Sequence, residues 1–410
     1  AVETWRGTPG PVLVNLEGHG REDIVAGADV SRTVGWFTSS YPVAISGDAR
    51  AVKETLHQIP DRGMGYGLLR WLNPETVQAL KDYADPQIAF NYLGRYGEEA
   101  EEPAPEIRAM TGLVDMPLGY ALELNAITQA YPTGDRLTAT WTWSSELLTD
   151  EDVRRISALW LTELEATEPI GHTPSDLPLV QITQAEIDQL EARAKIADVL
   201  PLAPLQQGLH FHTTYDEDAV DVYTIQAALT LTGEVDAQAL REAVRTLLRR
   251  HDNLRAFFVM GENARQVIPT EVDVPWVELD VEPGEVTGIL AEDRTKRFDL
   301  TNPPMLRCTL IRAGGETRFV ITVHHILVDG WSMPLLIGEL FDLYKTHGDD
   351  SALPPVVPYR DYLAWLHLEV FSILRTKDKL KYLAGSESGM AVWINDTTPE
   401  AVAERLRNAS

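Results

Sequence analysis

The chain has 410 residues, 35 of them basic and 62 acidic, which gives a net charge of −27. This charge argues against nucleic acid as a partner, because the phosphates would be repelled. No apolar run approaches the roughly 20 residues of a membrane span, and no signal segment opens the sequence, so no membrane partner is expected. The length leaves room for two or three domains.

The cysteine content bears on the compartment. Cys308 is the single cysteine of the sequence, which excludes an internal disulfide and fits a reducing cytoplasm. Because it lies inside an alternating apolar segment, we expect a small core residue rather than a nucleophile.

Residues 1–167 mix strand and helix signals and contain several glycine-rich runs. Considered alone, these runs indicate turns, including a Gly-Tyr-Gly bend that enters a helix. The first run contains the pair Glu17 and His19, and such a Glu-x-His pair on a loop is more often solvated than catalytic. A segment rich in proline and glutamate at Gly97–Pro105 indicates an exposed loop. The runs are Leu16–Glu22 (LEGHGRE), Asp29–Thr38 (DVSRTVGWFT), Gly63–Arg70 (GMGYGLLR) and Phe90–Gly94 (FNYLG).

A linker and a short helix are predicted for residues 168–197. The segment Thr167–Pro178 combines prolines and a glycine with few apolar residues, which is typical of an interdomain linker. Thr183 and Glu186 then have the spacing of a capping box, so we expect a helix to begin there.

Residues 198–365 predict a second α/β unit. Apolar residues alternate along three segments, which indicates strands, and recur at helical spacing along two others. Ala313–Glu316 fits a hairpin turn between two of the strands. The strands are expected at Thr224–Leu231, Leu306–Ile311 and Arg318–Val323, and the helices over Leu240–Leu248 and Trp331–Tyr344.

The run Val323–Gly330 (VHHILVDG) has the form HHxxxDG and lies at a predicted strand-to-helix junction. A rigid scaffold can hold a base towards a cleft at such a junction. If the strand continues through the pair, His324 and His325 point to opposite faces. One histidine can then be reactive while the other is packed.

The sequence predicts no metal site and leaves its end unassigned. His210 and His212 stand two residues apart with no further cluster of ligands. Residues 366–410 form an atypical C-terminal tail, in which Thr398-Pro399-Glu400 could open a short helix.

The HHxxxDG run belongs to an ordered set of motifs. In order and spacing, the set resembles the first four core motifs of condensation domains of non-ribosomal peptide synthetases. The residues within the motifs are most similar to the subtype that accepts a D-configured donor and an L-configured acceptor. The other members are Pro201–Leu209 (PLAPLQQGL), Arg250–Arg255 (RHDNLR), Gly330-Trp331-Ser332 and Tyr359–Trp365 (YRDYLAW).

This resemblance covers residues 198–365 and implies a fold. Condensation domains are α/β proteins with two lobes, each like chloramphenicol acetyltransferase, with a mixed sheet and packed helices. Their active site lies in a tunnel between the lobes. Residues 198–365 would be the N-terminal lobe.

The resemblance also implies roles for residues at the motif. His325 would orient the acceptor amine and manage its proton, a task that suits an imidazole. His324 would be packed, and Asp329 would be a structural anion, with Arg255 as the candidate partner. Further positions are Gly330, which would allow close approach of the backbone, and Trp331 and Ser332, which would line the tunnel.

The runs in residues 1–167 together resemble the C-terminal lobe of epimerization domains from the same synthetases. Such a domain inverts the α-carbon of a carrier-bound aminoacyl or peptidyl thioester. The resemblance implies that Glu17 is one acid/base group, and that Asn91 and Tyr92 line the tunnel. The partner of Glu17 would be the histidine of another HHxxxDG motif, about one lobe earlier, and this sequence does not contain it.

These expectations describe a fragment across a module junction, with each domain half present. Because the first residue is Ala1 rather than Met, we expect a piece of a longer polypeptide, inactive or nearly so alone. No cofactor is expected to bind directly. The substrates would arrive on the phosphopantetheine of separate peptidyl carrier domains, and adenylation domains of the same synthetase would load them.

Two other functions fit part of the pattern. The chain could be a free-standing HxxxDG-type acyltransferase that uses coenzyme A thioesters. It could also be a non-catalytic remnant that only docks carrier proteins.

Overall fold

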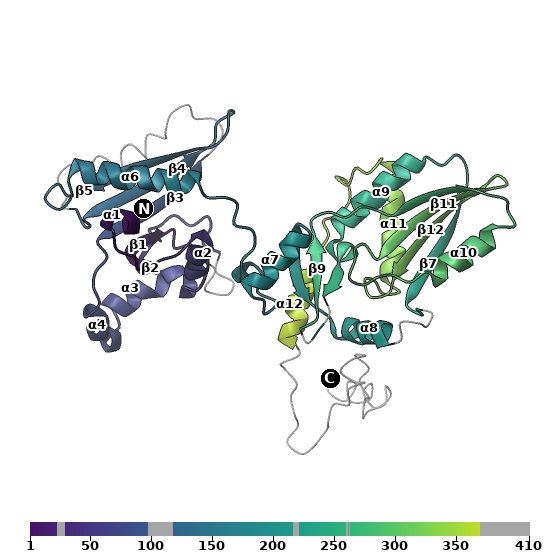
Figure 1. The fold of residues 1–410 in the computed structure, drawn as a ribbon, viewed down its shortest axis with the longest axis horizontal. Helices are drawn as coiled ribbons and strands as arrows, with labels where there is room; N and C mark the ends of the chain where they lie inside the picture. Colours follow the sequence, from purple (N-terminus) through teal and green to yellow (C-terminus); the bar gives the residue numbers. More distant parts are fainter. Residues whose placement is uncertain (23–28, 97–117, 216–220, 260, 262, 370–410) are drawn as a thin grey trace, which may run out of the picture. The chain divides into compact units, whose positions relative to one another are not determined.

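The computed structural model describes residues 1–22, 29–96, 118–215, 221–259, 261 and 263–369. The chain divides into two compact units, Ala1–Ser175 and Asp176–Ser410 (Figure 1). Each unit has a mixed α/β structure of the predicted class. Each is described by itself.

The first unit is built on a five-stranded sheet of order β2-β1-β3-β4-β5. The central strands β1, β3 and β4 are parallel, whereas β2 and β5 pair antiparallel at the edges. The strands are β1 Val12–Gly18, β2 Ser39–Ile45, β3 Ile88–Tyr96, β4 Leu122–Gln129 and β5 Arg136–Trp143. The helices are α1 Val2–Arg6, α2 Ala49–His57, α3 Met64–Trp71, α4 Pro74–Lys81 and α6 Asp150–Glu165, with a 3-10 turn η1 at Pro60–Gly63.

One face of this sheet is apolar because alternate residues of the strands pack under α6. Leu122 of β4 forms a small core with Val153 and Ile156 of α6, to which Trp141 and Trp143 of β5 add. Helix α6 lies along this side in Figure 1 and begins at a capping box between Thr149 and Asp152. The residues between these apolar positions therefore point to the other face.

The predicted bend at the start of α3 lies earlier than expected. Gly65 and Gly67 are both inside the helix, and the chain turns at Gly63, whose φ is 78°. A Cβ at Gly63 would lie 2.1 Å from the ring of Tyr41. Glycine is therefore required here by both the backbone conformation and the close approach.

The second unit contains a four-stranded sheet of order β10-β11-β12-β7 and a three-stranded sheet of order β6-β9-β8. The strands are β6 Ile196–Pro201, β7 Thr224–Leu231, β8 Phe257–Val259, β9 Arg265–Pro269, β10 Trp276–Asp280, β11 Leu306–Ala313 and β12 Glu316–His324. The helices are α7 Gln184–Arg193, α8 Pro204–Tyr215, α9 Ala237–Arg250, α10 Val286–Thr295, α11 Ser332–Lys345 and α12 Tyr359–Glu369, with a 3-10 turn η3 at Asp252–Arg255. A further 3-10 turn, η2 Pro174–Asp176, lies at the boundary between the units.

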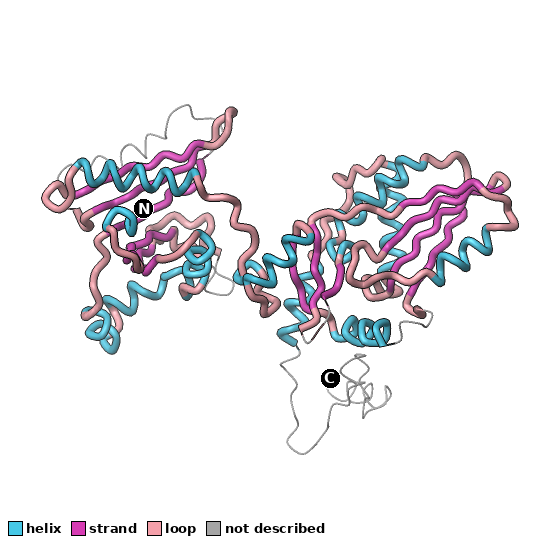
Figure 2. The backbone as a smooth tube through the Cα atoms, in the orientation of Figure 1, coloured by secondary structure: helices cyan, strands magenta, loops and turns pink. Residues whose placement is uncertain are grey.

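The four-stranded sheet is covered on both faces, and this explains the continuous burial of β12. Phe319 and Ile321 belong to the main core with residues of α9 and α11, whereas Val320 packs with Val286 of α10 on the opposite face. Figures 1 and 2 show α9 and α11 on one side of these strands and α10 on the other. A strand buried on both faces has an apolar rather than an alternating sequence.

Most predicted elements of the second unit are confirmed. The strand at Thr224–Leu231 has the predicted bounds, and the hairpin of β11 and β12 turns between Ala313 and Glu316. The helix α7 begins at the predicted capping box of Thr183 and Glu186. Cys308 is buried in the core, as expected, and burial raises the pKa of its thiol.

Residues 168–197 were expected to hold a linker and a short helix, and the helix α7 lies within them. The boundary between the units falls after Ser175, and Leu177, Ile182 and Ile187 are buried in the core of the second unit. The connection between the units is therefore shorter than the composition suggested. The expected loop at Gly97–Pro105 and the helix at Thr398-Pro399-Glu400 lie outside the described residues, and so does the predicted tail 366–410 beyond α12.

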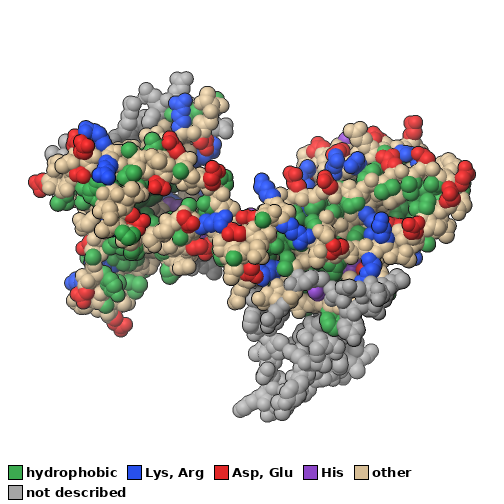
Figure 3. Space-filling model, in the orientation of Figure 1, with side chains coloured by type: hydrophobic (Ala, Val, Ile, Leu, Met, Phe, Trp, Pro, Cys, Tyr) green, Lys and Arg blue, Asp and Glu red, His purple; other side chains and the backbone are tan. Residues whose placement is uncertain are grey.

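Within the described ranges, none of the helices is long and apolar enough to cross a membrane. On the face shown in Figure 3, acidic and basic side chains are interspersed on each unit. The negative charge of the chain is therefore spread over this face rather than gathered in one patch.

Candidate functional site

The last residue of β12 is His324, and its side chain is completely buried. Its Nδ1 accepts a hydrogen bond from the N–H of Ile326 at 3.1 Å. The ring proton therefore lies on Nε2, which is 3.1 Å from Oδ2 of Asp221. The rings of Tyr223 and Phe298 enclose the imidazole, each with its centroid 6.4 Å away.

Asp221 is the charged partner of this buried histidine. Its side chain is 2 % exposed, and Oδ2 is not well aligned for a hydrogen bond in spite of the short contact. Burial raises the pKa of the Asp221 carboxyl, but the interaction with His324 and the N–H of Tyr223 outweigh it and lower the pKa overall. Asp221 and His324 thus form a buried polar pair that fixes the start of the HHxxxDG loop.

His325 lies just beyond the strand, in a turn, and is partly exposed. Its backbone N–H donates to the carbonyl of Tyr223 at 2.8 Å. Its Nδ1 is 2.6 Å from the carbonyl oxygen of Val328. Because a carbonyl can only accept, Nδ1 carries the proton and Nε2 is left with a lone pair. The loop therefore presents Nε2 of His325 as a proton acceptor.

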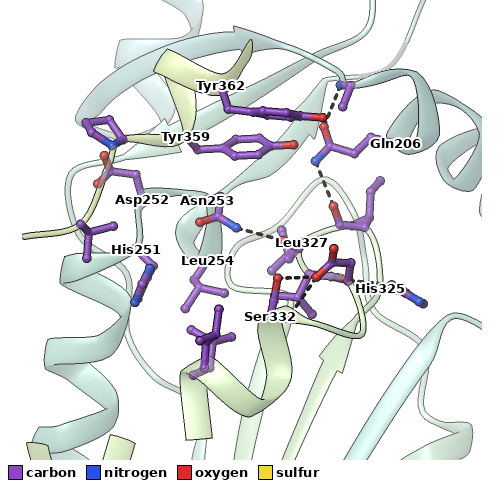
Figure 4. Close-up of a pocket in the computed structure, with 18 of the residues that line it drawn as sticks. Gln206, His251, Asp252, Asn253, Leu254, His325, Leu327, Ser332, Tyr359 and Tyr362 are labelled. Carbon is purple, nitrogen blue, oxygen red and sulfur yellow. Dashed lines mark hydrogen bonds between the residues drawn. The ribbon is translucent and has the colours of Figure 1, made fainter. Parts of the chain in front are cut away.

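A pocket of about 560 Å³ lies beside this loop. Its walls include Tyr359 and Tyr362, whose rings are stacked with centroids 5.7 Å apart. Burial, and to a lesser degree the neighbouring Tyr362 and Asp329, raise the pKa of Tyr359 to about 12. Figure 4 shows the imidazole of His325 pointing away from the two tyrosines. The pocket thus borders the HHxxxDG loop rather than surrounding the ring.

Two further side chains hold the loop and were not assigned a role from the sequence. The amide nitrogen of Gln206 donates to the carbonyl of Ile326, and that of Asn253 donates to the carbonyl of Leu327, both at 2.9 Å (Figure 4). These residues belong to the motifs PLAPLQQGL and RHDNLR. The motifs contain both residues, but their hydrogen bonds to the HHxxxDG loop join segments distant in sequence and are apparent only in the structure.

The predicted pairing of Asp329 with Arg255 is not what the structure shows. The guanidinium of Arg255 donates to the carboxylate of Asp252 and to backbone carbonyls, among them that of Pro269. Asp329 instead accepts from the N–H and hydroxyl of Ser332, at 2.8 and 2.7 Å. These bonds satisfy a free N–H at the first residue of α11, where a negative charge is favourable.

We expect the substitution Asp329→Ala to lower the free energy of unfolding of the second unit by about 1 kcal/mol, the usual net value of an intramolecular hydrogen bond. The hydrogen bonds from Ser332 outweigh burial and hold the pKa of Asp329 below its usual 3.8. This stabilisation is therefore complete above pH 3.8 and is lost as the pH falls through the lower pKa of the folded state. Urea unfolding at neutral pH and below pH 3.8 checks both statements. An equal loss at both pH values would contradict this role.

The remaining predicted residues of the motif lie at the surface of the second unit. Trp331 is 84 % exposed. A Cβ at Gly330 would meet no atom within 4 Å, and its φ is not in the left-handed region. Nothing within the described part of the second unit therefore requires glycine at this position.

In the first unit, Glu17 and Asn91 share one face of the sheet, and Tyr92 does not. The register aligns Leu16 of β1 with Phe90 of β3, so Glu17 and Asn91 are the next residues along two parallel strands. Tyr92 follows Asn91 on the same strand and points to the opposite face, where its hydroxyl is 2.9 Å from that of Thr128. Of the two predicted tunnel residues, only Asn91 is placed to face Glu17.

Glu17 lies near the end of β1 and is solvent-accessible. Partial desolvation by the sheet and, secondly, the charge of Glu123 raise the pKa of its carboxyl. A carboxyl with a raised pKa is suited to exchange protons near neutral pH.

Comparison with known proteins covers both units. The family model described as "Condensation domain" matches residues 6–183 and 196–378. One of the linear gramicidin synthase subunits of Brevibacillus parabrevis is 35% identical over 87% of this chain and 8% of its own length. Bacitracin synthase 3 of Bacillus licheniformis is 31% identical over 86% of this chain and 6% of its own length. The chain thus spans only a small part of these relatives.

Among solved structures, the X-domain from teicoplanin biosynthesis is similar to 44% of this chain and 40% of its own, with 26% identity and a TM-score of 0.39. The first condensation domain of the CDA synthetase is similar to 41% of this chain and 44% of its own, with 20% identity and a TM-score of 0.37.

Proposed function

Since this chain belongs to the condensation domain family, we propose that it is part of a non-ribosomal peptide synthetase and contributes to peptide-bond formation. The two substrates are thioesters on the phosphopantetheine arms of peptidyl carrier domains, loaded by adenylation domains. No cofactor is bound directly. The α-amine of the acceptor attacks the donor carbonyl, so the enzyme needs no covalent nucleophile.

The state of His325 is the observation that carries this proposal. With Nδ1 committed to the carbonyl of Val328, Nε2 has a lone pair that can accept a hydrogen bond from the amine. That bond orients the nitrogen towards the carbonyl carbon and gives its proton a destination. The buried pair of His324 and Asp221, together with Gln206 and Asn253, keeps the loop rigid around this acceptor.

For the first unit we propose the related epimerization reaction. Glu17 removes or returns the α-proton of a carrier-bound aminoacyl or peptidyl thioester, and Asn91 faces the same space. The raised pKa of Glu17 supports this role. The order of the units supports it too, because an epimerization domain makes the D-configured donor that the following condensation domain consumes.

Each proposed domain has one lobe in this sequence, and a tunnel needs two. We therefore expect the chain alone to form no dipeptide when it is incubated with aminoacylated donor and acceptor carriers, as measured by mass spectrometry of the acceptor carrier. Robust dipeptide formation that disappears in His325→Ala would overturn the expected inactivity.

The same experiment separates the two other functions. Acyl transfer from a soluble acyl coenzyme A to an amine would support a free-standing acyltransferase. Carrier binding without turnover, even after the missing lobe is supplied, would support a docking remnant. Neither outcome agrees with the proposed function.

A further inference from the structure

The open face of the first-unit sheet carries two glutamates in neighbouring rows. Asn15, Ala89 and Glu123 align across β1, β3 and β4. Because these strands are parallel, the next residues on the same face are Glu17, Asn91 and Asn125. Asn91 and Asn125 are a register pair. Glu123 therefore lies on the same face as Glu17, one row back and two strands away.

Hydrogen bonds between neighbouring side chains connect the strands on this face. Asn15 and Ser40 exchange hydrogen bonds of 2.7 and 3.1 Å between β1 and β2. The hydroxyl of Tyr120, which stands just before β4, is hydrogen-bonded to Ser40. Tyr120 therefore reaches from the side of Glu123 towards the strand that pairs with Glu17.

The charge of Glu123 acts on two neighbouring groups, Glu17 and Tyr120. Desolvation and then the charge of Glu123 raise the pKa of Glu17. Burial raises the pKa of Tyr120; a hydrogen bond with Ser40 opposes this shift, and the charges of Glu17, Glu123 and Asp85 add to it.

The other charged groups near Glu17 along the chain are engaged elsewhere. His19 in the loop after β1 and Arg62 of η1 both lie 3.4 Å from the carboxylate of Glu22. The facing positions are Ser40 on β2 and Asn91 on β3, which are uncharged. Among the described residues, Glu123 is thus the charged side chain whose field acts on Glu17.

We propose that Glu123 is a positioning residue, which keeps the Glu17 carboxyl able to exchange a proton with a substrate carbon by holding a like charge across the polar face of β1, β3 and β4. This inference rests on the proposed epimerization role of Glu17. A glutamate with ordinary acidity would be almost fully ionised near neutral pH and could take a proton but rarely return one. Glu123 shifts that balance without touching the substrate.

The test is a titration of Glu17 in the full chain, which needs no turnover. The side-chain carboxyl carbons of glutamate are followed by NMR against pH, and the Glu17 signal is assigned from its absence in Glu17→Gln. In Glu123→Gln the apparent pKa of Glu17 should fall by about half a unit, the repulsion expected for partly exposed charges roughly 10 Å apart. In Glu123→Lys it should fall further.

The matched control is Glu151→Gln, at the start of α6 on the opposite side of the sheet, which should leave the Glu17 titration unchanged. Glu123→Asp keeps the charge and should retain most of the shift. Circular dichroism checks that each variant is folded. If Glu123→Gln moves the Glu17 pKa no more than the control does, the proposal is wrong.

If the proposed epimerization function is wrong but the proposed role of Glu123 is right, the two experiments give different results. In that case the titration would still show the coupling of the two glutamates, while α-proton exchange into deuterated solvent would remain absent from the complete domain.

Discussion

The substitution His324→Ala is expected to lower the free energy of unfolding of the second unit by about 3–5 kcal/mol, the usual cost of leaving a buried charge without its partner. It leaves the Asp221 carboxylate in a site where its side chain is 2 % exposed, without the imidazole that faces it. It also opens a cavity against the rings of Tyr223 and Phe298. Urea unfolding followed by tryptophan fluorescence measures the loss, since Trp276 packs against Phe319 in this unit.

The adjacent histidine provides a matched control. His325→Ala removes a partly exposed ring whose Nδ1 is bonded to one backbone carbonyl, so it should cost no more than about 1 kcal/mol. Adding Asp221→Asn to His324→Ala should restore part of the lost stability, because the buried charge is removed. Equal losses for the two histidine variants would refute the assignment of His324 as the structural member of the pair.

The predictions that succeeded rest on local physics. Alternation along Thr224–Leu231 predicted a strand with the observed bounds, and the Thr183–Glu186 spacing predicted the observed start of α7. A capping box and a period-2 pattern depend on residues within a few positions of each other. Such signals are readable before any tertiary contact is known.

The linker prediction failed in part because composition does not report burial. The predicted linker Thr167–Pro178 contains few apolar side chains, yet Leu177 within it is 1% exposed in the core of the second unit. Its burial depends on partners that are distant in sequence. The predicted pairing of Asp329 with Arg255 was also wrong. Arg255 instead pairs with Asp252, which lies three residues before it along the chain.

The misplacement of Tyr92 has a different cause. Asn91 and Tyr92 are consecutive residues of β3, where side chains point alternately to opposite faces, but the run Phe90–Gly94 was predicted only as a turn. His324 and His325 do differ in environment, but β12 ends at His324 and His325 lies in a turn, so a continued strand is not the reason. No local pattern indicates that Asp221, Gln206 and Asn253 converge on the HHxxxDG loop, because each lies on a different segment of the second unit.

We expect His325→Ala to reduce dipeptide formation by about 10²- to 10⁴-fold, the usual contribution of a positioned acid/base group, in a longer chain that includes a C-terminal condensation lobe. The variant removes the Nε2 lone pair that the Val328 carbonyl leaves available, so the acceptor amine loses both its orientation and its proton acceptor. The measurement is the single-turnover rate between loaded carriers. His347→Asn, at an exposed loop position, is the control and should keep full activity.

The pH dependence of that rate distinguishes the two contributions of His325. If the imidazole takes the proton, the deficit of His325→Ala should shrink as the pH rises, because a growing fraction of the acceptor amine is already deprotonated. A deficit that is constant with pH would assign His325 to orientation alone. A variant with undiminished rate in the extended chain would show that the lone pair of Nε2 has no part in the reaction, and the proposed mechanism would then be wrong.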